Sequence, residues 1–128
     1  GAYEAAARYT AERKQFGRTI DSFPAIRERL ARHQSQVEAA RLLTYKAAWL
    51  KDQGRRMTLE SAMAKLYSSE IAVRVAEDGV QIHGGYGFVK DYPAEKFFRD
   101  VKLTTIGEGT SEIQGVGIAC ELLKGRAP

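Results

Sequence analysis

Two long segments with apolar residues at helical spacing constrain the fold of this chain more than any other feature. The first covers residues 24–53 and the second 58–82, and "QGRRM" between them breaks the pattern. Pro24 suits the first turn of a helix, and Thr58 suits an N-cap. At 1.5 Å per residue the first helix would span about 45 Å. The apolar positions expected to face a core are Ile26, Leu30, Val37, Ala40, Leu43 and Ala47 in the first segment, and Ala62, Met63, Leu66, Ile71, Val73, Val80 and Ile82 in the second.

Three shorter helices complete the predicted architecture. Residues 2–15 are rich in alanine, glutamate and arginine, and Gly17 ends that segment. Another helix covers "PAEKFFRDVK" (93–102), and the last begins at Thr110 or Ser111 and runs to Leu123. No segment has a notable strand pattern. The sequence therefore predicts an all-α fold, an antiparallel four-helix-type bundle, with residues 1–128 as a single domain. The apolar line expected along the last helix is Ile113, Val116, Cys120 and Leu123.

The composition excludes several classes of function. Of the 128 residues, 44% are hydrophobic and 28% charged, which is typical of a soluble globular domain. The net charge of +4 is dispersed, so nucleic acid is not an expected partner. Cys120 lies among apolar helical positions, which predicts a buried thiol, and a lone cysteine suits a reducing compartment. His33 and His83 lie far from it, so no metal site is expected, and neither a membrane span nor a signal peptide is recognisable.

Three unusual loops interrupt the predicted helices. "RKQFG" (13–17) combines cationic and amide groups, "QIHGGYGF" (81–88) is rich in glycine, and "GEGTSEI" (107–113) places Glu108 between two glycines at a helix start. Glycine permits close approach of backbone to a ligand, and a helix N-terminus favours negative charge. Taken singly, each loop also fits an ordinary solvated helix end or turn.

Together and in this order, these segments resemble the C-terminal helical domain of the acyl-CoA dehydrogenases. The resemblance covers nearly the whole chain, and the last two loops are specific to the family. The matching pieces are "ERKQFG" (12–17), "EAARLLTYKAAWLKDQG" (38–54), "AMAKLYSSEIAVRVAEDGVQIHGGYGF" (62–88), "YPAEKFFRDVK" (92–102) and "IGEGTSEIQ" (106–114).

The resemblance implies a reaction and a base. Family members remove one hydrogen from each of the α and β carbons of an acyl-CoA thioester, giving the trans-2-enoyl-CoA. Glu108 matches the glutamate that takes the α proton, and Gly109 matches a position against the substrate. Such a base needs a dry pocket that raises its pKa toward neutrality. Gly107 stands where several members have tyrosine, which opens the pocket there.

The resemblance also implies the cofactor FAD, held by three strips of residues. The first strip is expected against the pyrophosphate and adenosine of a neighbouring subunit's FAD, the second against its adenosine part, and the third at the helix start that follows the base. These strips are Arg13, Lys14, Gln15 and Phe16; Gln81, Ile82, His83, Gly84 and Gly85; and Thr110, Ser111 and Glu112. We expect Glu108 to lie near residues 81–85 of the same chain or of a symmetry-related copy.

The implied protein is larger than this chain. Relatives carry an N-terminal helical domain and a middle β domain, so residues 1–128 are expected to be the C-terminal domain of a larger flavoenzyme and inactive alone. A homodimer or homotetramer is expected, with an electron-transfer flavoprotein as acceptor, in the bacterial cytoplasm or the mitochondrial matrix. The alternatives are a flavin oxidase of the same fold and a non-catalytic helical oligomerisation module.

Overall fold

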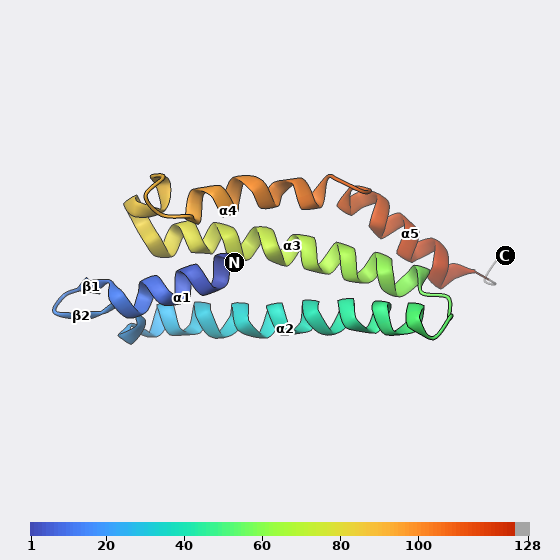
Figure 1. Cartoon of the computed structure of the whole chain (residues 1–128), viewed down its shortest axis with the longest axis horizontal. Coiled ribbons are helices and arrows are strands. Elements are labelled where there is room, and N and C mark those ends of the chain that lie inside the picture. The colour runs from blue at the N-terminus through green and yellow to red at the C-terminus, as the bar shows by residue number, and fades with distance from the viewer. Residues whose placement is uncertain (125–128) are drawn as a thin grey trace.

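The computed structural model describes residues 1–124, and helices form almost all of it (Figure 1). In chain order the elements are α1 (Ala2–Glu12), β1 (Lys14–Gln15), β2 (Arg18–Thr19), the 3₁₀ turn η1 (Ile20–Ser22), α2 (Pro24–Asp52), α3 (Thr58–His83), η2 (Gly84–Phe88), α4 (Ala94–Val101), η3 (Lys102–Thr105) and α5 (Ser111–Leu123). The all-α prediction is confirmed.

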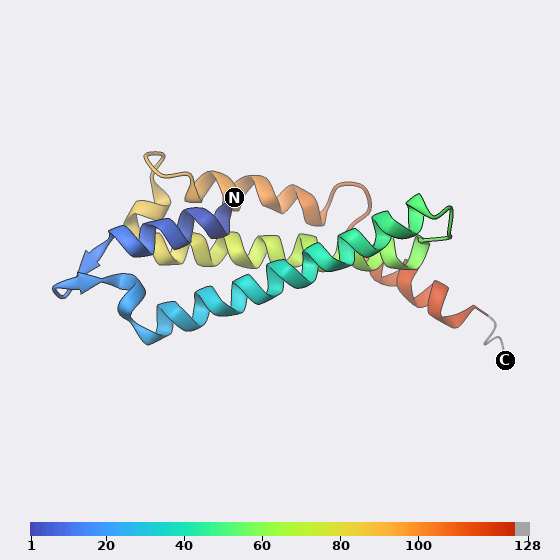
Figure 2. The ribbon, with the colours of Figure 1, turned by 60° about the horizontal axis from the view of Figure 1, so that its bottom comes forward.

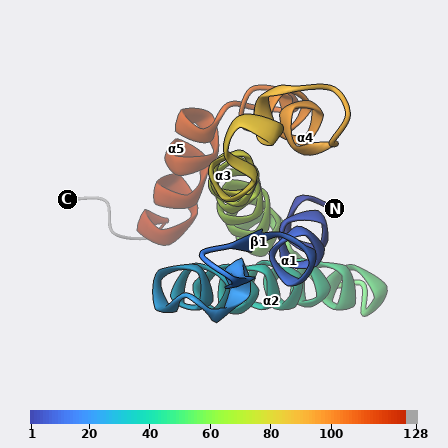
Figure 3. The ribbon, with the colours of Figure 1, turned by 90° about the vertical axis from the view of Figure 1, so that its left-hand side faces the viewer.

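Helix α3 is the centre of the bundle. It packs against α1, α2, α4 and α5, which surround it in the end-on view of Figure 3. Helix α2 runs antiparallel to α3 and crosses it obliquely, as the tilted view in Figure 2 shows. Many small residues of α3 are buried, including Ala64, Ala76 and Gly79, and they allow its neighbours to approach closely. Within residues 1–124, no helix is both long and apolar enough to cross a membrane.

The long helices follow their sequence signals closely. Pro24 opens α2 as predicted, and the helix extends to Asp52. Thr58 is the first residue of α3 rather than its N-cap, which is Met57, so the start is displaced by one position. Helix α3 ends at His83, where Gly84 adopts a positive φ of 61°. Thr110 is the N-cap of α5, and its Oγ1 accepts a hydrogen bond from the Ile113 backbone N–H at 3.4 Å.

The first predicted helix is too long, because a small hairpin replaces its end. Helix α1 stops at Glu12, and β1 and β2 pair antiparallel with Lys14 opposite Thr19. Phe16 and Gly17 at the tip both have positive φ, 52° and 77°, as two-residue hairpin turns require. A helix cannot contain two such residues in succession. The expectation of no notable strand is therefore wrong for this short segment.

The last helix presents the opposite face from the one predicted. Ile113 and Val116 are 62% and 60% exposed, and Leu123 and the Cys120 thiol are exposed as well. The partly buried positions include Ile118 and Glu121. An oxygen of Glu121 accepts from Arg56 at 2.8 Å, which ties this side of α5 to the α2–α3 connection. The apolar line of α5 thus faces outward, and the prediction of a buried thiol is wrong.

The main buried cluster lies at the hairpin end of the bundle. Tyr9 and Ile82 pack there against Ala6 and Ile20. On α3, the predicted core positions Ile71 and Ile82 are buried, whereas Met63 is exposed. The cluster joins α1, η1 and the end of α3, and so it holds together the segments that carry the first two unusual loops.

Candidate functional site

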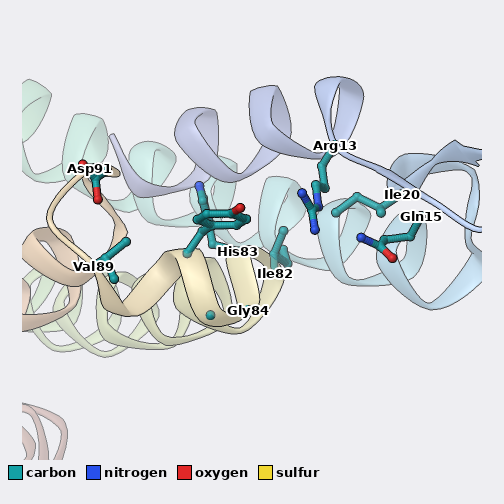
Figure 4. Close-up of a pocket in the computed structure, with 10 residues that line it drawn as sticks. Arg13, Gln15, Ile20, Ile82, His83, Gly84, Val89 and Asp91 are labelled. Carbon is teal, nitrogen blue, oxygen red and sulfur yellow. The ribbon is translucent and has the colours of Figure 1, made fainter.

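The first two unusual loops meet at the hairpin end and form an open pocket of about 660 Å³ (Figure 4). Arg13 and Gln15 reach it from the start of the hairpin, while the α3–η2 junction forms the opposite wall. Because side chains alternate along a strand, Arg13 and Gln15 share one side. The residues lining the pocket are Arg13, Gln15, Ile20, Ile82, His83, Gly84, Gly85, Tyr86, Val89 and Asp91.

An aromatic cluster supports this pocket. The His83 ring stacks on Tyr9 with 4.2 Å between ring centroids, and Tyr92 meets Tyr9 edge-on at 5.4 Å. The Arg13 guanidinium lies over the Tyr86 ring, 5.2 Å from its centroid. These contacts fix the ring of His83 and the direction of Arg13, two of the residues predicted to bind the cofactor.

Hydrogen bonds and burial set the protonation of the two stacked rings. His83 Nδ1 lies 2.7 Å from the Gly79 carbonyl, which can only accept, so Nδ1 carries a proton. In the neutral ring, Nε2 is then an acceptor. The Tyr9 hydroxyl donates to the His83 carbonyl at 3.4 Å. Burial raises the pKa of Tyr9 above its usual value, although Arg13 opposes the shift, so the phenol stays neutral at physiological pH.

Some predicted residues do not line this pocket. Lys14 and Phe16 are absent from its lining, and Phe16 is 91% exposed at the tip of the hairpin. Gln81 is exposed and also absent from the pocket lining. Sequence reasoning missed several lining residues. Tyr86 stood inside the quoted glycine loop and could have been found, but Ile20, Val89 and Asp91 belong to no motif and carry no local signal.

The third loop places Glu108 in a different pocket, of about 530 Å³, between α3 and η3. Glu108 has a φ of 56° and Gly109 a φ of 95°, so both adopt left-handed backbone. The φ of Gly109 is one that residues with a Cβ rarely adopt, which explains the glycine there. Glu108 itself is exposed in this chain, so the dry environment expected of a base is not present here. The other residues lining the pocket are Lys65, Ser68, Ser69, Ala72, Leu103, Thr104 and Gly107.

A third pocket, of about 470 Å³, adjoins the N-terminus of α5. Arg74 and Lys102 contribute cationic groups, and the three predicted residues Thr110, Ser111 and Glu112 line it together. Hydrogen bonds from the Thr110 side chain and from the backbone N–H of Glu112 itself lower the pKa of the Glu112 carboxyl. Ser111 Oγ is buried and has no hydrogen-bond partner within the described residues. A buried polar atom normally has a partner, so this hydroxyl fits a polar ligand group.

The three loops do not form one site within a single chain. The hairpin-end pocket and the Glu108 pocket share no lining residue, and α4 lies between their loops in Figure 1. Glu108 therefore does not lie near residues 81–85 of the same chain. That it lies near residues 81–85 of a symmetry-related copy stays a prediction. The hairpin-end pocket still fits part of a nucleotide cofactor, because it combines a guanidinium, a carboxamide and glycine backbone beside apolar walls. Within residues 1–124, no group of three or more His, Cys, Asp or Glu side chains is arranged to hold a metal ion.

Comparison with known proteins gives one consistent answer. Residues 1–123 match the family described as acyl-CoA dehydrogenase, C-terminal domain. The chain is 51% identical over 123 residues to the probable acyl-CoA dehydrogenase YngJ of Bacillus subtilis, covering 96% of this chain and 32% of that protein. It is 47% identical over 124 residues to the caffeyl-CoA reductase-Etf complex subunit CarC of Acetobacterium woodii, covering 97% and 33% respectively.

A solved structure agrees with these relatives. Butyryl-CoA dehydrogenase from Megasphaera elsdenii matches with a TM-score of 0.94 and 43% sequence identity, over 95% of this chain and 32% of that one. The chain therefore spans about a third of the length of the relatives that it matches.

Proposed function

The chain belongs to the acyl-CoA dehydrogenase family, and we propose that it is the C-terminal domain of an FAD-dependent enzyme that dehydrogenates acyl-CoA thioesters to trans-2-enoyl-CoA. The observation that carries the proposal is the placement of Glu108. The carboxylate stands on a left-handed turn beside Gly109 and lines a pocket with apolar and small side chains such as Ala72 and Leu103. A scaffold has no need for a carboxylate on a strained turn at a pocket.

Glu108 is proposed as the base that takes the α proton. The α C–H bond breaks, its proton passes to the Glu108 carboxylate, and the β hydrogen leaves as hydride. FAD supplies the acceptor for that hydride when it is bound. Gly109 allows the backbone to lie against the thioester. Glu108 is exposed in this chain, whereas a base for a C–H acid works best where water is excluded. Other parts of the enzyme are therefore proposed to cover Glu108 and complete its pocket.

The residues for FAD fall into two groups. Arg13, Gln15 and the His83–Gly85 backbone are proposed to hold the pyrophosphate and adenosine portion of a neighbouring subunit's FAD. Thr110, Ser111 and Glu112 are proposed to contact the chain's own FAD. The buried Ser111 hydroxyl, which has no hydrogen-bond partner among residues 1–124, supports this. Sharing between copies is consistent with the separation of the two pockets and implies a homodimer or homotetramer. Phe16, exposed at the hairpin tip, suits a contact with such a neighbour.

A second candidate is the same site working in the reductive direction. One relative at 47% identity is named as the subunit of a reductase complex with Etf. In that direction Glu108 would deliver a proton to the α carbon of an enoyl thioester, whose β carbon would receive the hydride that reduced FAD supplies when bound. The same name supports an electron-transfer flavoprotein as redox partner. The proposed location is the bacterial cytoplasm or the mitochondrial matrix.

Glu108→Gln in the full-length enzyme tests the proposal. Glutamine is nearly isosteric but cannot accept a proton, so we expect FAD to bind while the rate of flavin bleaching by acyl-CoA under anaerobic conditions falls by roughly 10²–10⁴-fold. Glu77→Gln, at an exposed position of α3, is the matched control and should bleach normally. A wild-type bleaching rate in Glu108→Gln would place the base elsewhere. A full-length protein that binds no flavin would favour the oligomerisation module instead.

A further inference from the structure

The side chain of Lys65, on α3, reaches the turn that carries Glu108, although Lys65 and Gly109 of that turn are 44 residues apart in the sequence. Its Nζ donates a hydrogen bond to the carbonyl oxygen of Gly109. Lys65 and Glu108 also line the same pocket. The lysine is partly buried. A partly buried charge that contacts the backbone beside a reactive carboxylate calls for an explanation.

The backbone of the turn supplies that explanation. Left-handed φ angles are unfavourable for a residue with a Cβ, so Glu108 needs outside support to hold a φ of 56°. The two carbonyls of the turn receive that support from side chains. Gln114 Nε2 donates to the Glu108 carbonyl at 3.2 Å, and Lys65 Nζ donates to the next carbonyl, that of Gly109.

Holding these two oxygens orients two successive peptide groups. A peptide group is planar, so fixing the Gly109 carbonyl also fixes the N–H of Thr110, the N-cap of α5. Fixing the Glu108 carbonyl likewise fixes the Gly109 N–H. The Glu108–Gly109 plane flanks the Cα of Glu108 and helps to set the direction of its side chain. The Gly109–Thr110 plane lies one residue further along and fixes how the turn joins α5. Of the two donors, Lys65 belongs to α3, the central helix, so its hydrogen bond holds the turn against the centre of the bundle.

We propose that Lys65 is a positioning residue for Glu108, which keeps the left-handed turn in the geometry that aims the carboxylate at the substrate. The inference rests on the proposed function of Glu108 as the base. Lys65 itself exchanges no proton with the substrate. Without its contact the Gly109 peptide group can rotate, and Glu108 can relax toward a negative φ. A displacement of the carboxylate by about 1 Å is enough to cost on the order of a hundredfold in rate.

Lys65→Met in the full-length enzyme removes the donor and keeps the length of the side chain. We expect the bleaching rate at saturating acyl-CoA to fall roughly 10–100-fold, while half-saturation shifts less than about threefold. FAD content and the visible flavin spectrum should not change. Lys96→Met, at an exposed position of α4, is the matched control and should leave the rate unaltered. Lys65→Arg retains a long-armed donor and should recover most of the rate, which loss of packing alone would not explain.

A double variant separates positioning from general damage. If Lys65 acts through Glu108, adding Lys65→Met to Glu108→Gln should cause little further loss, because residues that act as a unit are not additive. Equal fold losses in both backgrounds, or a wild-type rate in Lys65→Met, would overturn the role of Lys65 alone. Normal bleaching by Glu108→Gln would overturn the base and this inference with it.

A second variant covers a failure to fold. If Lys65→Met yields no flavin-loaded enzyme, Lys65→Gln keeps a polar head but is too short to reach the Gly109 carbonyl. The same selective loss of bleaching rate is expected of it. A Lys65→Gln enzyme that loads FAD and bleaches at the wild-type rate would contradict the inference.

Discussion

Asp78 joins the two long helices, and its removal should destabilise the bundle measurably. Its two carboxylate oxygens accept from Arg29 at 2.7 Å and contact His33 Nε2 at 2.5 Å. Both partners belong to α2, while Asp78 belongs to α3. His33 is 4% exposed, and its other ring nitrogen lies 3.1 Å from Gln36 Oε1. The carboxylate is thus the partner of a buried ring and of a cation.

The size of the effect follows from this geometry. Asp78→Ala removes two hydrogen bonds and leaves the buried His33 Nε2 without a partner, and an unsatisfied buried group costs about 1–3 kcal/mol. Arg29 keeps access to water, with its side chain 34% exposed, so its loss adds less. We expect a total of about 2–3 kcal/mol. For a domain of this size that corresponds to a decrease in Tm of roughly 6–12 °C.

Thermal unfolding of the purified chain, followed by far-ultraviolet circular dichroism, measures this decrease. Arg32→Met is the matched control, because Arg32 lies one turn from Arg29 and, within residues 1–124, forms its ion pair with Glu28 on the exposed face of the same helix. Such a surface pair contributes little to stability, so Tm should change by no more than about 2 °C. The reasoning is refuted if Asp78→Ala melts within 2 °C of Arg32→Met, since the cross-helix contact would then contribute no more than a surface pair.

Two further predictions concern the hairpin-end pocket. A Cβ on Gly87 would lie 2.5 Å from the Val80 carbonyl, a backbone atom that cannot easily move. Gly87→Ala should therefore displace η2, lower Tm by several degrees and weaken FAD retention in the full-length enzyme. Gly85→Ala is the control for stability, because within residues 1–124 its new Cβ would have no atom within 4 Å apart from its chain neighbours, and equal melting of the two variants would contradict the clash. The raised pKa of Tyr9 means that the folded state keeps its phenol proton where the unfolded chain has lost it. This contribution to stability is complete below the usual tyrosine pKa of 10.0 and is lost as the pH rises through the folded pKa. Tyr9→Phe should remove that alkaline loss, seen as a smaller decrease in Tm above about pH 10 than in wild type, and an unchanged alkaline limb would show that Tyr9 does not cause it.

The sequence by itself determined the helices and their approximate ends. Apolar spacing is a local property of each segment, and Pro24, Gly84 and the Thr110 cap act within one turn of their positions. The loops that carry Glu108 and residues 81–85 were also recognisable, because their glycines and their neighbours are adjacent in the chain. The stated resemblance to the acyl-CoA dehydrogenases, confirmed by the family match, rests on the same local features.

The tertiary structure decided what depends on residues far apart in sequence. The contacts of Lys65 with Gly109, His33 with Asp78 and Tyr9 with His83 join positions that no local pattern relates. The outward face of α5 was not predictable either, because it depends on which side of that helix meets α3 rather than on its own apolar line. The hairpin escaped prediction because its strands are two residues each, too short to show alternation, and its turn places Phe16 where glycine is usual. Local patterns set each helix, and long-range packing set which side chains meet around Glu108.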